Sequence, residues 1–162
     1  MEEIVDLVTK VDDIFKQVIN GKKDVFNDID QVLIASLEIE NMEGEVAKLG
    51  LCTISTKLDL INKLLEIDYS RSSSLEIMRE DFEKLELEKF NIESKYVMGM
   101  VSLDEIESFK LHLFNFKDRL YAIPINDNNL LEIARFKSKI QHFDTDILED
   151  EDILRQAYSN SN

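Results

Sequence analysis

The sequence predicts an all-α fold: an elongated antiparallel bundle of helical hairpins that pack along coiled-coil-like seams. Apolar residues recur at steps of three and four along nearly the whole chain, which is the spacing of one helix face. The 162 residues include only four glycines and one proline, whereas average usage would give roughly ten and about eight. Glycine and proline form the tight turns of sheets, so their scarcity favours long helices with short connections. Hydrophobic residues make up 44% of the chain, which is enough for a core.

Six helices are expected within residues 1–143, followed by an acidic C-terminal segment at residues 144–162 that can form a short helix. Gly21 is expected to end the first helix and Gly50 the second, while Gly44 weakens the second by about 1 kcal/mol relative to alanine. Residues 51–56 are interpreted as a connection. The expected helices cover residues 2–20, 23–49, 54–69, 74–98, 103–123 and 129–142. The seam of the first helix consists of Ile4, Val8, Val11, Phe15 and Val18.

Capping boxes mark the starts of the fourth and fifth helices. Ser73 is followed three residues later by Glu76, and Ser102 by Glu105, so that a hydroxyl accepts from an early helix N–H while the carboxylate reaches back. Pro124 ends the fifth helix because proline cannot continue it. The seam of the fourth helix, which skips one position at Lys89, consists of Leu75, Met78, Phe82, Leu85, Ile92 and Tyr96.

The serine run at residues 70–74 has two compatible interpretations. As a helix cap it already has a structural reason to exist. As a phosphorylation site, Ser72 or Ser73 would place a dianion at a helix N-terminus, where the helix dipole favours negative charge.

The fifth helix is the first candidate for a partner-binding surface. Its seam is complete, and Leu103, Leu111 and Phe114 add apolar surface on other faces. A helix that is apolar on more than one side is either central in its bundle or contacts a partner as well as its own core. The seam consists of Ile106, Phe109, Leu113, Phe116, Leu120 and Ile123, of which Phe109, Leu113, Phe116 and Leu120 are the candidate partner-binding residues.

The acidic C-terminal segment is the second candidate. It interleaves aliphatic side chains with six carboxylates, an arrangement typical of docking motifs that fold against a basic groove. An equally supported alternative is a terminal helix whose aliphatic residues cover the end of the bundle. The candidate residues here are Asp146, Ile147, Leu148, Glu149, Asp150, Ile153 and Leu154.

The sequence contains no recognisable catalytic, metal-binding or cofactor-binding motif. His112 and His142 with one distant cysteine, Cys52, do not make a zinc site, and neither histidine follows a glutamate at the spacing of a bundle di-iron site. A calcium loop fails because Ser73 and Arg79 occupy the positions that need glycine and a bidentate glutamate. A nucleophile elbow and a glycine-rich phosphate loop are both missing. We therefore expect a protein that is not an enzyme and that carries no cofactor.

The net charge of −15 and the helical seams together favour protein partners. A chain of this sign repels phosphate backbones and anionic lipids, so we expect no direct nucleic-acid binding. With a single cysteine, no secretory signal and no apolar run of roughly 20 residues, an intracellular, cytoplasmic or nuclear location without membrane insertion is expected.

The leading hypothesis is a structural or adaptor subunit that scaffolds a hetero-oligomer or homo-oligomer through its helical seams. The alternative is an acidic decoy, inhibitor or chaperone-like protein that occupies a basic site on a partner. A carrier with a ligand pocket lined by phenylalanines is a weaker third hypothesis.

Overall fold

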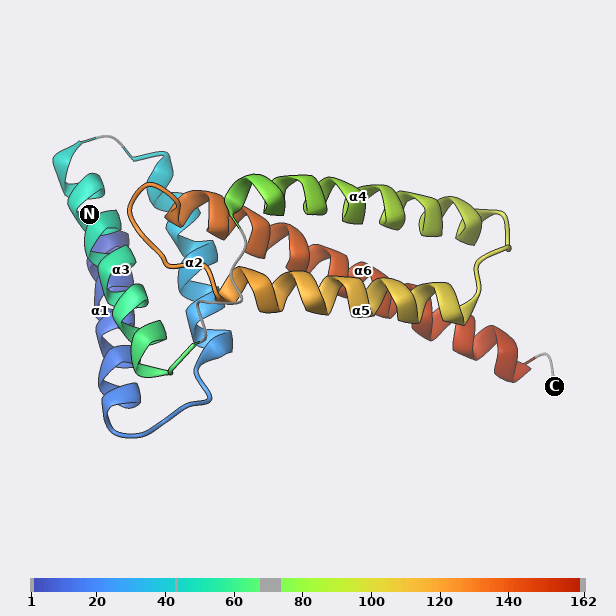
Figure 1. Ribbon diagram of the computed structural model, residues 1–162, viewed down its shortest axis with the longest axis horizontal. Coiled ribbons are helices and arrows are strands. Elements are labelled where there is room, and N and C mark those ends of the chain that lie inside the picture. Colours follow the sequence, from blue (N-terminus) through green and yellow to red (C-terminus); the bar gives the residue numbers. More distant parts are fainter. Residues whose placement is uncertain (1, 43, 68–73, 161–162) are drawn as a thin grey trace. The chain divides into compact units, whose positions relative to one another are not determined.

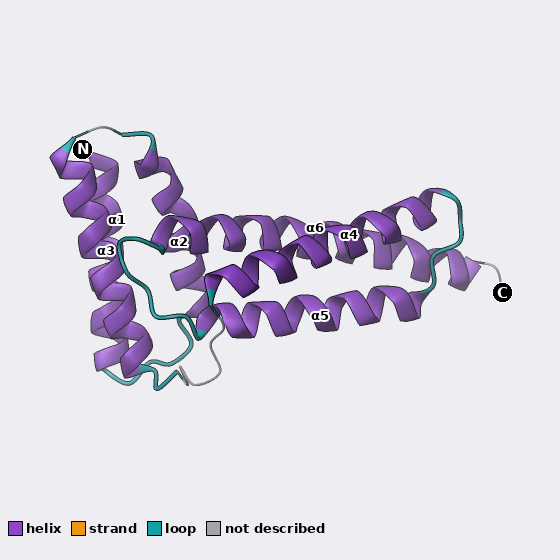
Figure 2. Ribbon diagram, turned by 45° about the horizontal axis from the view of Figure 1, so that its top comes forward, coloured by secondary structure: helices purple, strands orange, loops and turns teal. Residues whose placement is uncertain are grey.

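The computed structural model describes residues 2–42, 44–67 and 74–160, with backbone alone for 158–160, and these residues form six helices and no strand. An all-α helical bundle is therefore confirmed. The helices, drawn in Figures 1 and 2, are α1 (Glu2–Ile19), α2 (Phe26–Glu40), α3 (Glu45–Leu64), α4 (Leu75–Val97), α5 (Leu103–Tyr121) and α6 (Leu130–Asn160).

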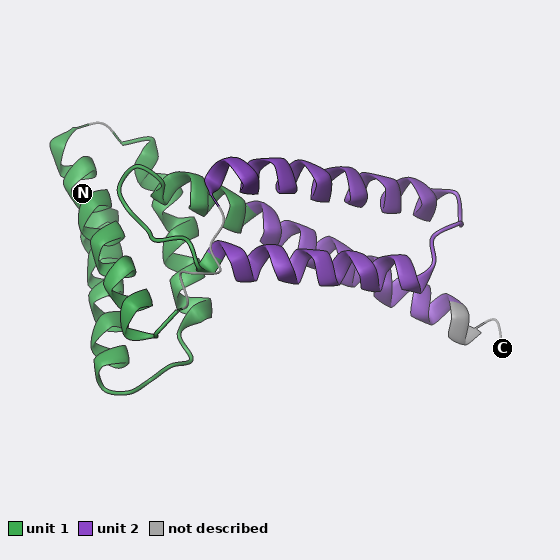
Figure 3. Ribbon diagram, in the orientation of Figure 1, with its two compact units in different colours: residues 1–71, 121–138 green, residues 72–120, 139–162 purple. Residues whose placement is uncertain are grey.

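Two compact units divide the chain, as coloured in Figure 3. Unit 1 consists of Met1–Arg71 and Tyr121–Ser138, and unit 2 of Ser72–Leu120 and Lys139–Asn162. Unit 1 therefore holds α1, α2, α3 and the first residues of α6, whereas unit 2 holds α4, α5 and the remainder of α6.

The break between α2 and α3 lies at residues 41–44 and not at Gly50, which corrects the expected helix bounds. Gly44 precedes α3 with φ of 115°, a conformation that side-chain-bearing residues rarely adopt. Gly50 instead lies inside α3, where a Cβ would stand 2.5 Å from Cγ2 of Ile4. The absence of a side chain at Gly50 lets α1 and α3 approach closely. Residues 51–56, expected to be a connection, are helical.

Helix α1 packs against two neighbours in unit 1. It runs parallel to α3, since Ile4 lies beside Gly50 and Asp12 bonds Lys57, and antiparallel to α2, where Lys10 donates to Gln31. Contact on two sides turns its core face slightly from the predicted seam, so that Val8 and Phe15 are only half-buried. The buried residues of α1 are Ile4, Leu7, Val11, Ile14 and Val18.

Unit 2 is a three-helix arrangement with an aromatic core. Ion pairs across the helices show that α5 is antiparallel to both α4 and α6, whereas α4 and α6 are parallel. Phe82 lies 5.7 Å from Phe116 and 5.5 Å from Phe143 between ring centroids, and Phe109 lies 6.4 Å from Phe143. The buried residues of α4 and α5 are Met78, Phe82, Leu85, Ile92, Ile106, Phe109, Leu113, Phe116 and Leu120.

Helix α6 is continuous from Leu130 to Asn160, which corrects the expected helix end at residue 142. The sequence between these residues holds neither glycine nor proline, so nothing in the backbone forces a break. Ile147 is buried, and neighbouring carboxylates lie against lysines of α4 and α5. None of the helices in the described part of the chain is both long and apolar enough to cross a membrane.

Candidate protein-binding surface

The four candidate residues of α5 lie in the core of unit 2. Phe109, Leu113, Phe116 and Leu120 are each at most 1% exposed. Their side chains pack against α4 and α6, so they are not accessible to a partner while unit 2 stays folded. The exposed apolar residues of α5 are instead Leu111 and Phe114, at 59% and 64%.

The candidate residues of the acidic segment are split between the core, the helix contacts and the surface. Ile147 is buried, Asp146, Asp150 and Leu154 are half-buried, and Leu148, Glu149 and Ile153 are exposed. The segment is part of a packed helix, which is the arrangement of the terminal-helix alternative rather than of a free docking motif.

The serine run lies mostly outside the described residues, and both phosphorylation candidates, Ser72 and Ser73, fall there. The N-cap of α4 is the next residue, Ser74, whose Oγ accepts a hydrogen bond of 3.3 Å from the backbone N–H of Ile77.

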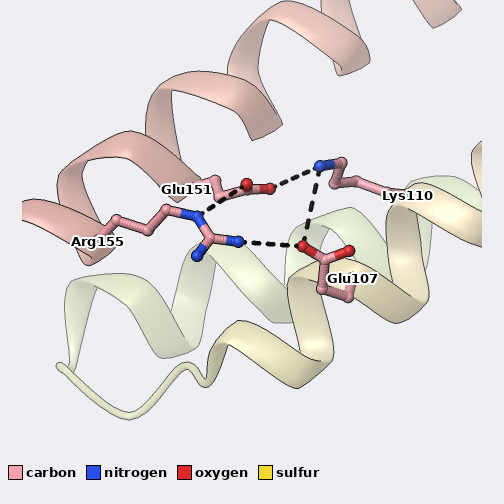
Figure 4. Close-up of polar contacts among 4 residues, drawn as sticks. All are labelled: Glu107, Lys110, Glu151 and Arg155. Carbon is pink, nitrogen blue, oxygen red and sulfur yellow. Dashed lines mark hydrogen bonds and ion pairs between the residues drawn. The ribbon is translucent and has the colours of Figure 1, made fainter. Parts of the chain in front are cut away.

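The contact between α5 and α6 is a charge-balanced network of two acids and two bases (Figure 4). Lys110 donates to Glu151 at 2.8 Å, Arg155 donates to Glu151 at 3.1 Å, and both cations also approach Glu107. The bond from Lys110 holds the pKa of Glu151 below its ordinary value, and the bond to Glu151 raises the pKa of Lys110. At this edge of unit 2 each acidic side chain is therefore paired with a basic side chain of the same chain.

At the contact between α4 and α6 the acidic side chains outnumber the basic ones. Lys89, at the gap in the α4 seam, bonds Glu93 at 2.8 Å and Asp146 at 3.0 Å and lies over the Phe143 ring. Burial by itself would lower the pKa of Lys89, but its hydrogen bonds to the two carboxylates raise it. Burial, followed by repulsion from Glu93 and Asp146, raises the pKa of Asp150. Two carboxylates thus bond one ammonium group, and a third, Asp150, lies close enough for their charges to raise its pKa; we call these four residues the Lys89 cluster.

An apolar stripe covers the outer face of α4. Leu87, Phe90 and Val97 are 65%, 67% and 85% exposed, and their spacing of three and seven residues places them on one side of the helix. Met98 and Met100, at 63% and 67%, extend apolar surface into the turn after α4. Sequence reasoning missed this stripe because it followed only the buried seam, although the spacing itself is visible in the sequence. Leu87, Phe90 and Val97 are called the α4 stripe below.

Two other groups of polar contacts do not involve the α4 stripe. In unit 1, Asp30 accepts from Tyr121 at 2.7 Å and pairs with the buried Lys137 at 3.1 Å. In unit 2, His112 lies 2.9 Å from Glu88, at a groove of about 370 Å³ whose Lys95 bonds Glu105. Within the described ranges, three or more acidic, histidine or cysteine side chains nowhere gather closely enough to hold a metal ion.

Comparison with known proteins gives no relative: no family model, no curated protein and no solved structure matches this chain. The fold and the surface define only a class, an all-α helical bundle with an exposed apolar stripe on one helix.

Proposed function

We propose that this protein is a non-enzymatic structural or adaptor subunit that binds another protein through the outer face of α4. The observation that carries the proposal is the α4 stripe, in which three large apolar side chains lie mostly exposed on one helix face. Single exposed apolar residues need no explanation, but a row of them on one face is typical of a binding site.

Burial of the α4 stripe supplies useful but limited binding energy. Covering one such side chain completely contributes about 1.5–3 kcal/mol, and these three are already partly covered. Their sum is therefore roughly 4–6 kcal/mol, which corresponds to a dissociation constant between about 1 mM and about 40 μM before the costs of association. A functional partner must make further contacts beside the stripe.

Other exposed apolar faces support the proposal less well. On α5 the exposed large apolar residues are Leu111 and Phe114, which follow Glu107 by four and seven residues and therefore lie on the side of the charge-balanced network. On α3 the exposed apolar residues are Val46, Leu49, Leu60 and Leu64, at 42–68%. Thr53 and Thr56 lie between them, and their hydroxyls donate to carbonyls of their own helix. The α4 stripe combines the largest exposure with an unbalanced charge edge.

Two variants matched in residue type test the proposal. Phe90→Ser together with Leu87→Ser removes most of the α4 stripe, whereas Phe114→Ser removes a phenylalanine of similar exposure from α5. We expect affinity purification with quantitative mass spectrometry to show partners that are retained by wild type and Phe114→Ser but lost from the double variant. Retention of the same partners by the double variant contradicts the proposal, provided that circular dichroism shows it folded.

The alternative of an acidic decoy predicts a different dependence on salt. Binding through charge alone weakens steeply as ionic strength rises, whereas binding anchored by apolar burial weakens only partly. Partner capture that disappears in 0.5 M salt and ignores Leu87→Ser and Phe90→Ser would favour the decoy.

A further inference from the structure

We propose that the α4 stripe takes an amphipathic helix of a partner protein whose lysines or arginines run along the edge that faces α6. This inference rests on the proposed function and adds the chemistry of the partner. It follows from the apolar spacing of the stripe and from the charge on its border.

The spacing of the stripe suits a helical partner. Leu87, Phe90 and Val97 lie along about 15 Å of α4, given a rise of 1.5 Å per residue. A partner helix that packs lengthwise presents its own apolar residues at steps of three and four over the same distance. Four apolar positions of a partner helix span the stripe.

The border of the stripe toward α6 is acidic. Glu93 lies on the α6 side of α4, because Lys89 joins it to Asp146 of α6. Glu86 precedes Glu93 by seven residues and therefore lies on the same side. With Asp146 and Asp150, these side chains line one edge of the apolar surface.

The charge imbalance at this edge favours cations from outside the chain. Glu93 and Asp146 both bond the single ammonium group of Lys89, and Asp150 lies near enough to be repelled by them, whereas the α5–α6 network has two acids for two bases (Figure 4). A metal ion does not fit, because the described residues offer no group of three ligands at the distances a metal needs. Side-chain cations on a partner helix supply the charge without such geometry.

Synthetic peptides test the inference on the full chain. The probe is a helical peptide of 18 residues with leucines at i, i+3, i+7 and i+10 and lysines along one edge; two further versions carry glutamine or glutamate in place of the lysines. Fluorescence anisotropy at several salt concentrations measures the affinity of each. We expect the lysine peptide to bind about tenfold more tightly than the glutamine peptide and the glutamate peptide to bind weakest.

Substitutions in the protein locate the binding. Asp150→Asn with Glu86→Gln is expected to weaken the lysine peptide about tenfold, and Leu87→Ser with Phe90→Ser to weaken all versions. Asp13→Asn with Glu38→Gln removes the same charge from exposed positions of unit 1 and controls for overall charge. Equal loss of affinity in this control, or equal binding of lysine and glutamate peptides, overturns the inference.

The two proposals fail in distinguishable ways. In one outcome, cellular partners are lost with Leu87→Ser and Phe90→Ser while the lysine peptide binds no more tightly than the glutamine and glutamate peptides. That result supports α4 as the binding surface and refutes the inference that the partner is basic. If partner capture ignores these substitutions, the proposed function itself is refuted. A second copy of this chain on the stripe, seen as a dimer that dissociates in the double variant, also overturns the inference.

Discussion

Units 1 and 2 bury their helices in different ways. In unit 1, small residues stand at helix contacts: Gly50 and Ala47 on α3 are buried, and Ser36 and Ser55 are buried with their hydroxyls bonded to carbonyls of their own helices. In unit 2, phenylalanines fill the core and long ion pairs cross between helices. Close packing of small residues leaves no space for larger ones, whereas aromatic packing depends on each ring.

Ion pairs between helices occur in both units, but the charge imbalance of the Lys89 cluster is found in unit 2. Long charged side chains at helix contacts place carboxylates near the surface, where they are half-screened and easily left unbalanced. The Lys89 cluster is such a case, and it borders the α4 stripe. The two kinds of packing also predict opposite sensitivities to substitution.

Truncation of an aromatic residue in unit 2 is expected to have the largest effect. Phe116→Ala removes a ring that is 1% exposed and packs at a tilt against Phe82, and should reduce the free energy of unfolding by about 3–5 kcal/mol. Phe114→Ala, on the same helix but 64% exposed, should change it by less than about 0.5 kcal/mol. Urea denaturation followed by circular dichroism measures both. Equal effects would contradict the assignment of Phe116 to the core.

Enlargement at a small residue of unit 1 comes second. Gly50→Val brings a Cβ to 2.5 Å from Cγ2 of Ile4, and the resulting overpacking should cost about 1–3 kcal/mol. That exceeds the gain of about 0.5 kcal/mol from valine's better helix propensity. Ile4→Ala removes the obstructing methyl group, so Gly50→Val should cost less in that background. Additive effects in this double-mutant cycle would argue against the close contact. Cys52→Leu, at an exposed position of α3, is the neutral control.

Substitution in the charge-balanced network has a smaller, pH-dependent effect. The pKa of Glu151 is lowered by folding, so its ion pairs stabilise the fold above its ordinary pKa of 4.5, and this contribution is lost as pH falls through the lowered value. Glu151→Gln should therefore reduce stability by less than about 1 kcal/mol at neutral pH, because the partners Lys110 and Arg155 are partly exposed. Thermal unfolding from pH 3 to 7 should show the difference shrinking in acid. A difference that is constant over this range would point to packing instead of charge.

Periodicity predicted the helical fold and the seams of α4 and α5. It could not distinguish a glycine that precedes a helix from a glycine at a contact between two helices. Gly44 and Gly50 look alike in sequence; Gly50 lies inside α3, and only the approach of Ile4 across a tertiary contact explains why a glycine stands there. The continuity of α6 was missed because the carboxylates and aliphatic residues of the C-terminal segment were interpreted as a separate docking motif or short terminal helix. Lysines of α4 and α5, remote in sequence, pair with them.

The candidate surface on α4 was not predicted, for a related reason. Phe109 and Phe114 are both phenylalanines of one helix, and the sequence alone does not say which faces a third helix. The structure buries Phe109 and exposes Phe114. Phe90 was overlooked because it falls one position outside the seam of α4, where exposure depends on where α6 packs.

The smallest predicted effect is the most informative about function. Folding raises the pKa of Asp150, so its charged form costs stability: the cost is absent below its ordinary pKa of 3.8, grows as pH rises through the raised value, and is complete at neutral pH. Asp150→Asn should therefore raise the melting temperature at pH 7 by about 1 °C, as expected for a few tenths of a kcal/mol at a partly exposed site, and leave it unchanged near pH 3.

Asp152→Asn, at an exposed position two residues away, is the control and should show no such pH dependence. Destabilisation by Asp150→Asn at pH 7 would contradict the charge imbalance of the Lys89 cluster. The same substitution is expected to weaken binding of the lysine peptide, so stability and binding should change in opposite directions. Glu151→Gln should lower stability and leave peptide binding unchanged, because its charges are already balanced within the chain. A carboxylate that destabilises the free protein but strengthens the binding of a cationic partner behaves as a binding residue. Functional sites retain such groups although folding alone would not favour them.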